Sequence, residues 1–577
     1  MNRDLTAWCR SIMVLILLTQ LSPSLAAQSR VRERASGSAA GSGGEFEGTI
    51  TGRVVFEGDY PAVGALVLAR AVGSTVWESD RLGIAECDQE GKFELTRLKP
   101  GAYLLSASRP GGVDLAAGSD PQIYRVGETA TIRMAGGGVI SGLVTDAAGE
   151  PLEGMRVTIY PKSGSTTSSL LIPESEEYTA LTDDRGLYRI YGIRPGTYLA
   201  RAADTPVQHF SFGRFRNDSP AYYSPGDRRA AAEITVRSGE ELKGIDIRHR
   251  GERGRNVSGI VSGRLESETI FNMVSVTLRD EASGELGGAT LMLGAGRFDI
   301  YGVPDGVYEV VARYFSERSG LMSSASRRIA VKGAHLTGVD LALPKPGSIS
   351  GRVIVESSRP GAGCSRPGRR SVEEIALRVK KVDGGESREE SRLAEVNAQG
   401  EFALGLQDGL YRIVPDLPGD DWYLKALTLA GRSAETARGG LSIKPGEMVT
   451  GLEVKVAEGA ATLRGRMAAA NESSGIAGAS VPPRWRAHLV PAEDAAADDL
   501  VCYAETIVRG DGSFELKHLA PGRYLLLVRE LSGKEADSPS RPTAWDPLER
   551  ERLRRDAQSR KQEIELGPCQ QATFTWR

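Results

Sequence analysis

Two strings decide the fold: VISGLVTDAAGEPLEGMRVTIY at residues 139–160 and LTDDRGLYRIYGIRPGTYLARA at residues 181–202. In the first string, Met155, Val157 and Ile159 alternate with arginine, threonine and tyrosine. An alternation of period two is typical of a strand with one buried face. In the second string, Asp-Asp-Arg-Gly and Arg-Pro-Gly place glycine where a tight turn requires a positive φ. The two strings therefore predict short, half-buried strands joined by tight turns.

The same three-part pattern occurs five times along the chain. It opens with a small residue, a glycine and a strand, continues with a polar turn and its glycine, and closes with Gly-x-Tyr before another strand. The opening glycines are Gly52, Gly142, Gly259, Gly351 and Gly465. The turn glycines, each followed two residues later by an aromatic residue, form the pairs Gly91/Phe93, Gly186/Tyr188, Gly296/Phe298, Gly400/Phe402 and Gly512/Phe514. The closing tyrosines are Tyr103, Tyr198, Tyr308, Tyr411 and Tyr524.

The spacing within the pattern is fixed, whereas the spacing between copies varies. From turn glycine to closing tyrosine the separations are 12, 12, 12, 11 and 12 residues, and the opening glycines lie 90, 117, 92 and 114 residues apart. A constant spacing within the pattern, combined with a variable spacing between copies, indicates a rigid structural unit that carries loop insertions of different lengths.

Each copy has the pattern of an antiparallel β-sandwich, with strands of about six residues separated by turns. A chain of 577 residues is too long for one hydrophobic core, because single cores stop growing at roughly 250–300 residues. We therefore expect an all-β tandem array of about five modules. Their expected spans are 47–135, 136–252, 253–345, 346–457 and 458–577, the last two being divergent copies.

One short helix is expected near the C-terminus. Asp546 can cap it, Pro547 can occupy its first position and Glu549 its third. Leu548 and Leu553 are then available to pack against the last module.

The strings quoted above resemble the carboxypeptidase regulatory-like domain, a transthyretin-like β-sandwich related to Cna B-type and starch-binding-like modules with a carbohydrate-binding-like fold. The resemblance is closest at residues 136–250 and weakest at 346–457 and 458–577. In that family the module accompanies a catalytic or transport domain and is not itself known for chemistry. The resemblance therefore implies a secreted bacterial protein of several modules, without a catalytic centre or a cofactor of its own.

The first residues read as a secretory signal peptide. Arg3 and Arg10 precede a short apolar run, and Ser24 to Ala26 supply small residues for cleavage after position 26. Residues 27–46, which include GSAAGSGG, are expected to form a flexible linker. We expect a secreted or periplasmic protein with no transmembrane segment after cleavage.

The composition argues against nucleic-acid binding and against metal chemistry. The chain has 72 basic and 75 acidic residues, a net charge of −3, and only five histidines and five cysteines. The string His249-Arg-Gly-Glu252 matches half of a zinc-binding motif, but it falls at a junction between modules, where a solvated linker is the simpler interpretation. We expect no enzyme activity, no cofactor and no metal site.

Residues 206–226 are rich in aromatic side chains interleaved with arginine. Such a segment can stack on sugar rings or anchor a protein partner. Alternatively, it folds back and buries its aromatic rings as a small satellite core. The candidate ligand-binding residues are Phe210, Phe212, Arg214, Phe215, Tyr222 and Tyr223.

Two cysteines fall within the last copy, in a compartment where disulfides persist. We predict that Cys502 and Cys569 pair, and the alternative is two reduced, buried thiols. Cys87 and Cys364 lie in different modules and are expected to be unpaired.

These observations favour a non-catalytic, secreted scaffold of the cell envelope or the extracellular space, acting as a spacer or an adhesive surface. Its expected partner is an envelope or extracellular protein, or a polysaccharide. An alternative function is carbohydrate binding through the aromatic segment, and a more remote one is an enzyme associated with metallocarboxypeptidase chemistry.

Overall fold

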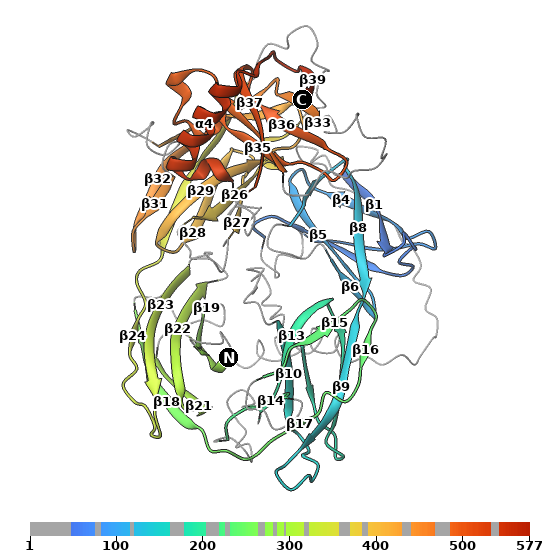
Figure 1. Cartoon of the computed structure of the whole chain (residues 1–577), viewed down its shortest axis with the longest axis vertical. Helices are drawn as coiled ribbons and strands as arrows, with labels where there is room; N and C mark the ends of the chain where they lie inside the picture. Colours follow the sequence, from blue (N-terminus) through green and yellow to red (C-terminus); the bar gives the residue numbers. More distant parts are fainter. Residues whose placement is uncertain are drawn as a thin grey trace, which may run out of the picture. The chain divides into compact units, whose positions relative to one another are not determined.

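The computed structural model (Figure 1) describes residues 48–74, 82–115, 121–161, 178–203, 218–224, 231–263, 272–280, 286–293, 296–316, 322–356, 370–382, 391–429, 440–467, 485–531 and 542–576. All of the described residues belong to one compact unit of the chain, Phe46–Arg577. The predicted signal peptide and linker lie outside the described residues.

The described strands form ten sheets, which combine in pairs along the chain into five modules. Module 1 contains β1 (Gly48–Phe56), β2 (Leu66–Ala71), β3 (Leu82–Glu86), β4 (Lys92–Leu98), β5 (Ala102–Ser108), β6 (Gly112–Asp114), β7 (Ile123–Arg125) and β8 (Thr129–Gly136). Module 2 contains β9 (Gly138–Thr145), β10 (Arg156–Pro161), β11 (Tyr178–Leu181), β12 (Leu187–Ile193), β13 (Gly196–Ala203), β14 (Ala221–Tyr222), β15 (Ile234–Val236), β16 (Glu241–Leu242) and β17 (Ile247–Arg248). Module 3 contains β18 (Arg255–Ser262), β19 (Asn272–Asp280), β20 (Leu286–Leu293), β21 (Gly296–Val303), β22 (Gly306–Ser316), β23 (Met322–Val331) and β24 (Leu341–Ala342).

The last two modules add short helices to the same plan. Module 4 contains β25 (Gly347–Glu356), η2 (Val372–Glu374), β26 (Ala376–Lys381), β27 (Ser391–Glu395), β28 (Glu401–Leu406), β29 (Gly409–Asp416), β30 (Trp422–Leu429), β31 (Leu441–Ile443) and β32 (Met448–Glu458). Module 5 contains β33 (Ala461–Met467), β34 (Trp485–Pro491), η3 (Asp494–Ala496), η4 (Leu500–Cys502), β35 (Ala504–Ile507), β36 (Ser513–Leu519), β37 (Gly522–Glu530), η5 (Thr543–Trp545), α4 (Pro547–Arg560), β38 (Glu563–Leu566) and β39 (Gln571–Trp576). The prediction of an all-β array with a short C-terminal helix is confirmed for the described part of the chain.

All five modules share one strand topology. The first strand pairs antiparallel with the strand that follows the polar turn, as β1 does with β4. It also pairs in parallel with a strand at the end of the module, as β1 does with β8. The corresponding parallel pairs are β9 with β16 and β17, β18 with β24, β25 with β32, and β33 with β39. Each otherwise antiparallel sandwich is therefore closed by parallel pairing between its first and last strands.

The core of each module lies between its two sheets. In module 2, Met155, Val157 and Ile159 point into this core and are at most 1% exposed, as their alternation predicts. The opposite face of β10 is also covered, because Thr158 and Tyr160 are buried. The prediction of a half-buried strand is therefore wrong for β10, which is a central strand with protein on both faces.

The opening glycine and the aromatic residue of the pattern are direct cross-strand partners. Gly142 on β9 lies opposite Tyr188 on β12. A Cβ atom at Gly142 would stand 2.1 Å from the carbonyl oxygen of Ile245 and 3.1 Å from the Tyr188 ring. Glycine is therefore required where the ring and the end of the module press against the first strand. The same pairing joins Gly52 to Phe93, Gly259 to Phe298, Gly351 to Phe402 and Gly465 to Phe514.

The glycine of the polar turn is required for a different reason. Gly186 has a φ of 72°, a region that favours glycine. The same prediction is wrong for Gly196 of Arg-Pro-Gly, which has no positive φ and begins β13. A Cβ atom there would also stand 2.6 Å from the carbonyl oxygen of Val144. The Asp183 carboxylate stabilises the turn by accepting hydrogen bonds from the backbone N–H groups of Arg185 and Leu187, at 3.0 and 2.8 Å. The Arg185 side chain and these N–H groups lower the pKa of Asp183.

The closing tyrosine fixes the turn that precedes it. The hydroxyl of Tyr198 donates a hydrogen bond of 2.7 Å to the carbonyl oxygen of Arg194, four residues earlier. This geometry is like the tyrosine corner of other β-sandwiches. It recurs with donor–acceptor distances of 2.8 to 3.0 Å at Tyr103, Tyr308, Tyr411 and Tyr524.

Helix α4 begins as the sequence predicts. The Asp546 carboxylate accepts hydrogen bonds from the backbone N–H groups of Leu548 and Glu549, and Pro547 occupies the first turn. Leu553 is 2% exposed, whereas Leu548 is 70% exposed, so only Leu553 packs as expected. Among the described residues, no helix has the length and apolarity needed to span a membrane.

Candidate functional site

The aromatic segment of module 2 is only partly described. Phe210, Phe212, Arg214 and Phe215 lie outside the described residues. Tyr222 is half-buried on β14, opposite Arg201 of β13.

Tyr223 contributes to the fold of module 2. Its half-buried ring packs against the hydrophobic core. Its N–H donates to the carbonyl oxygen of Ala200, and its carbonyl oxygen accepts from the N–H of Ala232, both at 2.9 Å. The described end of the segment thus shares in core packing, as the satellite-core alternative expects, and Tyr222 stays a candidate for ligand contact.

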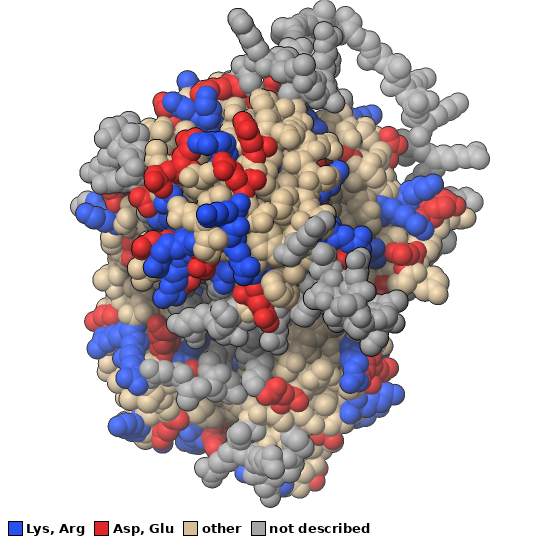
Figure 2. All heavy atoms as spheres, turned by 45° about the horizontal axis from the view of Figure 1, so that its top comes forward, with Lys and Arg blue, Asp and Glu red and all other residues tan. Residues whose placement is uncertain are grey.

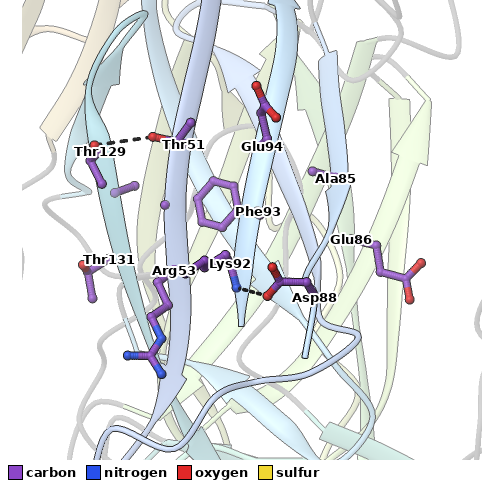
Figure 3. A pocket seen from close by; sticks show the side chains of 12 residues that line it. Thr51, Arg53, Ala85, Glu86, Asp88, Lys92, Phe93, Glu94, Thr129 and Thr131 are labelled. Carbon is purple, nitrogen blue, oxygen red and sulfur yellow. Dashed lines mark hydrogen bonds between the residues drawn. The ribbon is translucent and has the colours of Figure 1, made fainter. Parts of the chain in front are cut away.

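A groove of about 680 Å³ lies on module 1, along β1, β4 and β8 and beside the end of β3 (Figure 3). Its lining combines the threonines Thr51, Thr129 and Thr131 with charged side chains of both signs. The hydroxyls of Thr51 and Thr129 are 3.4 Å apart. The Asp88 carboxylate accepts a hydrogen bond of 2.7 Å from the backbone N–H of Lys92. The lining of the groove can therefore form hydrogen bonds with a polar ligand. No sequence motif predicted this groove.

Module 5 contains a buried polar cluster under its C-terminal helix. Arg486 and His488, on the outer face of β34, are 2% and 1% exposed. Glu505 of β35 pairs with both, at 2.9 Å from Arg486 Nη1 and 3.1 Å from His488 Nδ1. Thr543 accepts a hydrogen bond of 2.9 Å from Arg486 and donates its backbone N–H to Glu505 at 2.8 Å. Burial lowers the pKa of His488, and the Glu505 carboxylate opposes this effect.

A second apolar layer surrounds this cluster. Val490, Leu525 and Leu527 of the sheet pack against Leu553 and Ala557 of α4. The cluster therefore joins β34 and β35 to the segment before α4. The scattered single histidines of the sequence gave no signal for this cluster, whose buried groups hold β34, β35 and the segment before α4 together.

The predicted disulfide between Cys502 and Cys569 is wrong. Cys502 is a free, half-buried thiol at the end of η4, while Cys569 is disulfide-bonded. The two cysteines lie in different segments. Cys502 ends η4, which is capped by the Asp499 carboxylate. The backbone N–H of Cys569 donates to the carbonyl oxygen of Gly459, at the start of the module. Burial, with Asp499 and Glu493 nearby, raises the pKa of Cys502 to about 11, which makes its thiol unreactive. Cys87 is free as expected, and Cys364 lies outside the described residues.

His249 does not lie in a solvated linker as expected. It is 3% exposed, and its backbone N–H donates to the carbonyl oxygen of Thr145 at 2.7 Å. Within the described ranges, no group of three or more histidine, cysteine or acidic side chains is arranged to hold a metal ion.

Charged side chains of both signs are interspersed on the face shown in Figure 2. Basic and acidic groups pair across many short distances, as Arg464 does with Glu515 at 2.9 Å and Arg523 with Glu493 at 3.5 Å. This mixed surface agrees with the balanced composition.

Comparison with known proteins identifies one domain. Residues 139–219 match the carboxypeptidase regulatory-like domain. No curated protein matches the chain. The resemblance seen in the sequence of module 2 is thereby confirmed.

Several solved structures are similar to parts of the chain. A streptococcal ancillary pilin is 12% identical, with a TM-score of 0.16, over 52% of this chain and 99% of the pilin. The minor pilin GBS52 of Streptococcus agalactiae is 15% identical, with a TM-score of 0.19, over 35% of this chain and 96% of that chain. The major pilin subunit BcpA of Bacillus cereus is 11% identical, with a TM-score of 0.13, over 56% of this chain and 99% of the subunit. Identities and TM-scores of this size establish no shared function.

Proposed function

We propose that this chain is a non-catalytic structural scaffold outside the cytoplasm, which holds partners of the cell envelope at a distance and bears tension between its ends. The location rests on the predicted signal peptide. The mechanical role rests on the strand topology that all five modules share.

The parallel pairing of first and last strands carries this proposal. In module 4, β25 and β32 are paired from Ser348 opposite Met448 to Glu356 opposite Ala457. In a parallel pair the two strands run in the same direction, so tension from the two ends of a module pulls them past each other. The hydrogen bonds between them are then loaded together in shear, instead of opening one after another. A module built in this way resists stretching.

The repeated residues support the same interpretation. The opening glycine, its aromatic partner and the closing tyrosine each have a role in packing or in a turn, in every module. A pattern that repeats only in folding residues is expected of an array in which the fold itself, rather than one shared site, is required.

In-cell crosslinking tests the scaffold proposal. A photo-crosslinking residue is placed at Ile84, Tyr191 or Met448, which lie in modules 1, 2 and 4 and are 71%, 68% and 73% exposed. The scaffold proposal expects adducts with envelope proteins from more than one module, absent without illumination. Adducts from one module alone, or a chain retained in the cytoplasm, would contradict it.

Carbohydrate binding by module 2 is the second candidate, favoured by Tyr222 on β14 at the end of the aromatic segment. The test compares Tyr222→Ala with Tyr191→Ala, because Tyr191 is an exposed tyrosine of the same module on β12. Retention on a polysaccharide that is lost only in Tyr222→Ala supports this candidate. Equal retention of both variants, or none by the unmodified chain, counts against it. The remote metallocarboxypeptidase-associated alternative requires stoichiometric zinc in the purified protein, which elemental analysis measures.

A further inference from the structure

Module 1 contacts module 4, although modules 2 and 3 lie between them in the sequence. Arg125, the last residue of β7, is buried in this contact, with its side chain 6% exposed. Its Nε donates a hydrogen bond of 2.9 Å to the carbonyl oxygen of Glu374, 249 residues further along the chain. Its Nη2 donates to the carbonyl oxygen of Asp416 at 3.0 Å and forms an ion pair with the Asp416 carboxylate.

Module 4 also contributes an arginine to this contact. Arg378 on β26 donates a hydrogen bond of 3.1 Å to the carbonyl oxygen of Pro121 in module 1. The same Nη2 lies 3.3 Å from the second carboxylate oxygen of Asp416. Asp416 thus holds one arginine from each module, and Glu128 lies 4.0 Å from Arg125 Nη1. The positive charge of the two guanidinium groups is balanced locally.

An apolar cluster adjoins these charges. Val72, Ala102 and Ile123 of module 1 are buried together with Ala376 of module 4. Leu104 and Leu393, one from each module, pack against them. An apolar centre beside a buried arginine that carries several directed hydrogen bonds is the composition of a specific interface.

Modules 4 and 5 are also joined by contacts. Lys517 Nζ lies 2.9 Å from the Asp420 carboxylate, and His518 Nδ1 lies 2.9 Å from the carbonyl oxygen of Trp422. Arg412 of module 4 donates to the carbonyl oxygen of Trp545 at 3.3 Å. Module 1, module 4 and module 5 are therefore linked by non-covalent contacts that do not pass through modules 2 and 3.

From these contacts we propose that the module 1–module 4 contact is a releasable load path that shields modules 2 and 3 from tension. Tension between the ends of the chain passes from module 1 to module 4 across Arg125 and Asp416, so the intervening modules are loaded only after the contact breaks. Its rupture lengthens the chain by the span of two folded modules before any module unfolds. The proposal rests on the proposed scaffold function, for which it supplies the order of events under load.

Single-molecule stretching with handles at both ends of the secreted chain tests this proposal. The unmodified protein is expected to show an event at lower force than module unfolding, which reverses when the tension is relaxed. Arg125→Ala removes the side chain that donates to Glu374 and Asp416, and Asp416→Ala takes the shared carboxylate away from two buried guanidinium groups. In each variant the lifetime of the docked state under constant low force should fall about tenfold or more. The double variant should be little worse than either single variant, because both remove the same contact.

Glu401→Ala is the matched control. It removes an exposed carboxylate of module 4, which lies 3.2 Å from Arg352 on the first sheet of that module, and it should leave the event unchanged. Module unfolding at unaltered forces in every variant shows that each one still folds.

The proposal is overturned if the unmodified chain lacks the reversible event, or if all four variants retain it with the same lifetime. Either result leaves the scaffold proposal intact, because that proposal is judged by the crosslinks formed at Ile84, Tyr191 and Met448. Conversely, crosslinks confined to one module contradict the scaffold without affecting the reversible event.

Discussion

The glycine opposite each aromatic residue illustrates how single residues decide this fold. In module 5 a Cβ atom at Gly465 would stand 1.9 Å from Cζ of Phe514, a ring that is 2% exposed. The ring lies directly beneath the first strand because glycine leaves room for it. Any larger residue must displace either the ring or the strand.

Gly465→Ala is therefore expected to destabilise module 5 by about 1–3 kcal/mol, the usual cost of overpacking a core. Gly510→Ala is the control in the same module, because a Cβ atom there meets nothing within 4 Å. Chemical denaturation followed by tryptophan fluorescence measures both. Equal stability of the two variants would contradict this account of the opening glycine.

Substitution of a closing tyrosine provides a second test at the level of single residues. Tyr198→Phe removes the hydrogen bond to the carbonyl oxygen of Arg194 and keeps the ring. A loss of about 1 kcal/mol in the free energy of unfolding is expected. Tyr191→Phe removes the hydroxyl of a ring that is 68% exposed, and its effect should be within about 0.5 kcal/mol. If Tyr198→Phe is as stable as Tyr191→Phe, the hydrogen bond is not needed to hold the turn.

The buried histidine of module 5 should make stability depend on pH. Burial lowers the pKa of His488, with Arg486 and Arg529 adding to the effect and Glu505 opposing it. In the unfolded chain the pKa returns to about 6.5. As the pH falls below this value, the unfolded chain takes up a proton that the folded module resists, so the free energy of unfolding decreases.

Unfolding measured between pH 8 and pH 5 should show this decrease in the unmodified chain, and His488→Asn should reduce it. His335→Asn, which alters an exposed histidine of module 3, should keep the decrease. A His488→Asn variant with the pH dependence of the unmodified chain would show that other groups cause it.

At the scale of the element, the C-terminal helix depends on its cap. Asp546→Ala removes the acceptor for the N–H groups of Leu548 and Glu549 and is expected to cost about 1 kcal/mol. Asp556→Ala, at an exposed position within the same helix, should cost less than half as much. The two variants are compared by thermal unfolding. Loss of helicity in Asp556→Ala alone would contradict the assigned cap.

Local sequence patterns were sufficient to place the strands, the turn at Gly186 and the start of α4, but not to predict the backbone conformation of Gly196. They record backbone requirements, such as the positive φ of Gly186, that act within a few residues. They failed for Thr158 and Tyr160, whose outer face of β10 is covered, and for Leu548, which stays exposed although it can reach a core in principle. Whether such a side chain is covered depends on which distant segment lies above it.

The candidate sites depend even more on contacts between residues that are far apart in the sequence, which is why the sequence predicted them poorly. The cluster of Arg486, His488 and Glu505 forms because β34 pairs with β35 and a later segment covers both. Cys502 is free at the end of η4 and Cys569 is disulfide-bonded in the turn before β39, and no spacing of cysteines encodes these two states. Four of the six aromatic-segment candidates lie outside the described residues, so that prediction remains open for ligand binding.

At the scale of the whole molecule, five copies of one sandwich follow each other, each closed by parallel first and last strands. We propose that this chain resists tension. Because each module has its own core between its own two sheets, the modules should fail separately. Because the closing strands are loaded in shear, each should hold until its ladder breaks as a unit. Crosslinking reports partners and location, whereas only stretching reports this property.

The most direct measurement is the unfolding record of a single chain stretched between its ends. After the reversible release of module 1 from module 4, we expect five abrupt unfolding events, each releasing the residues of one module, with no gradual lengthening between them. One cooperative event for the whole chain, or continuous lengthening at low force, would contradict this expectation.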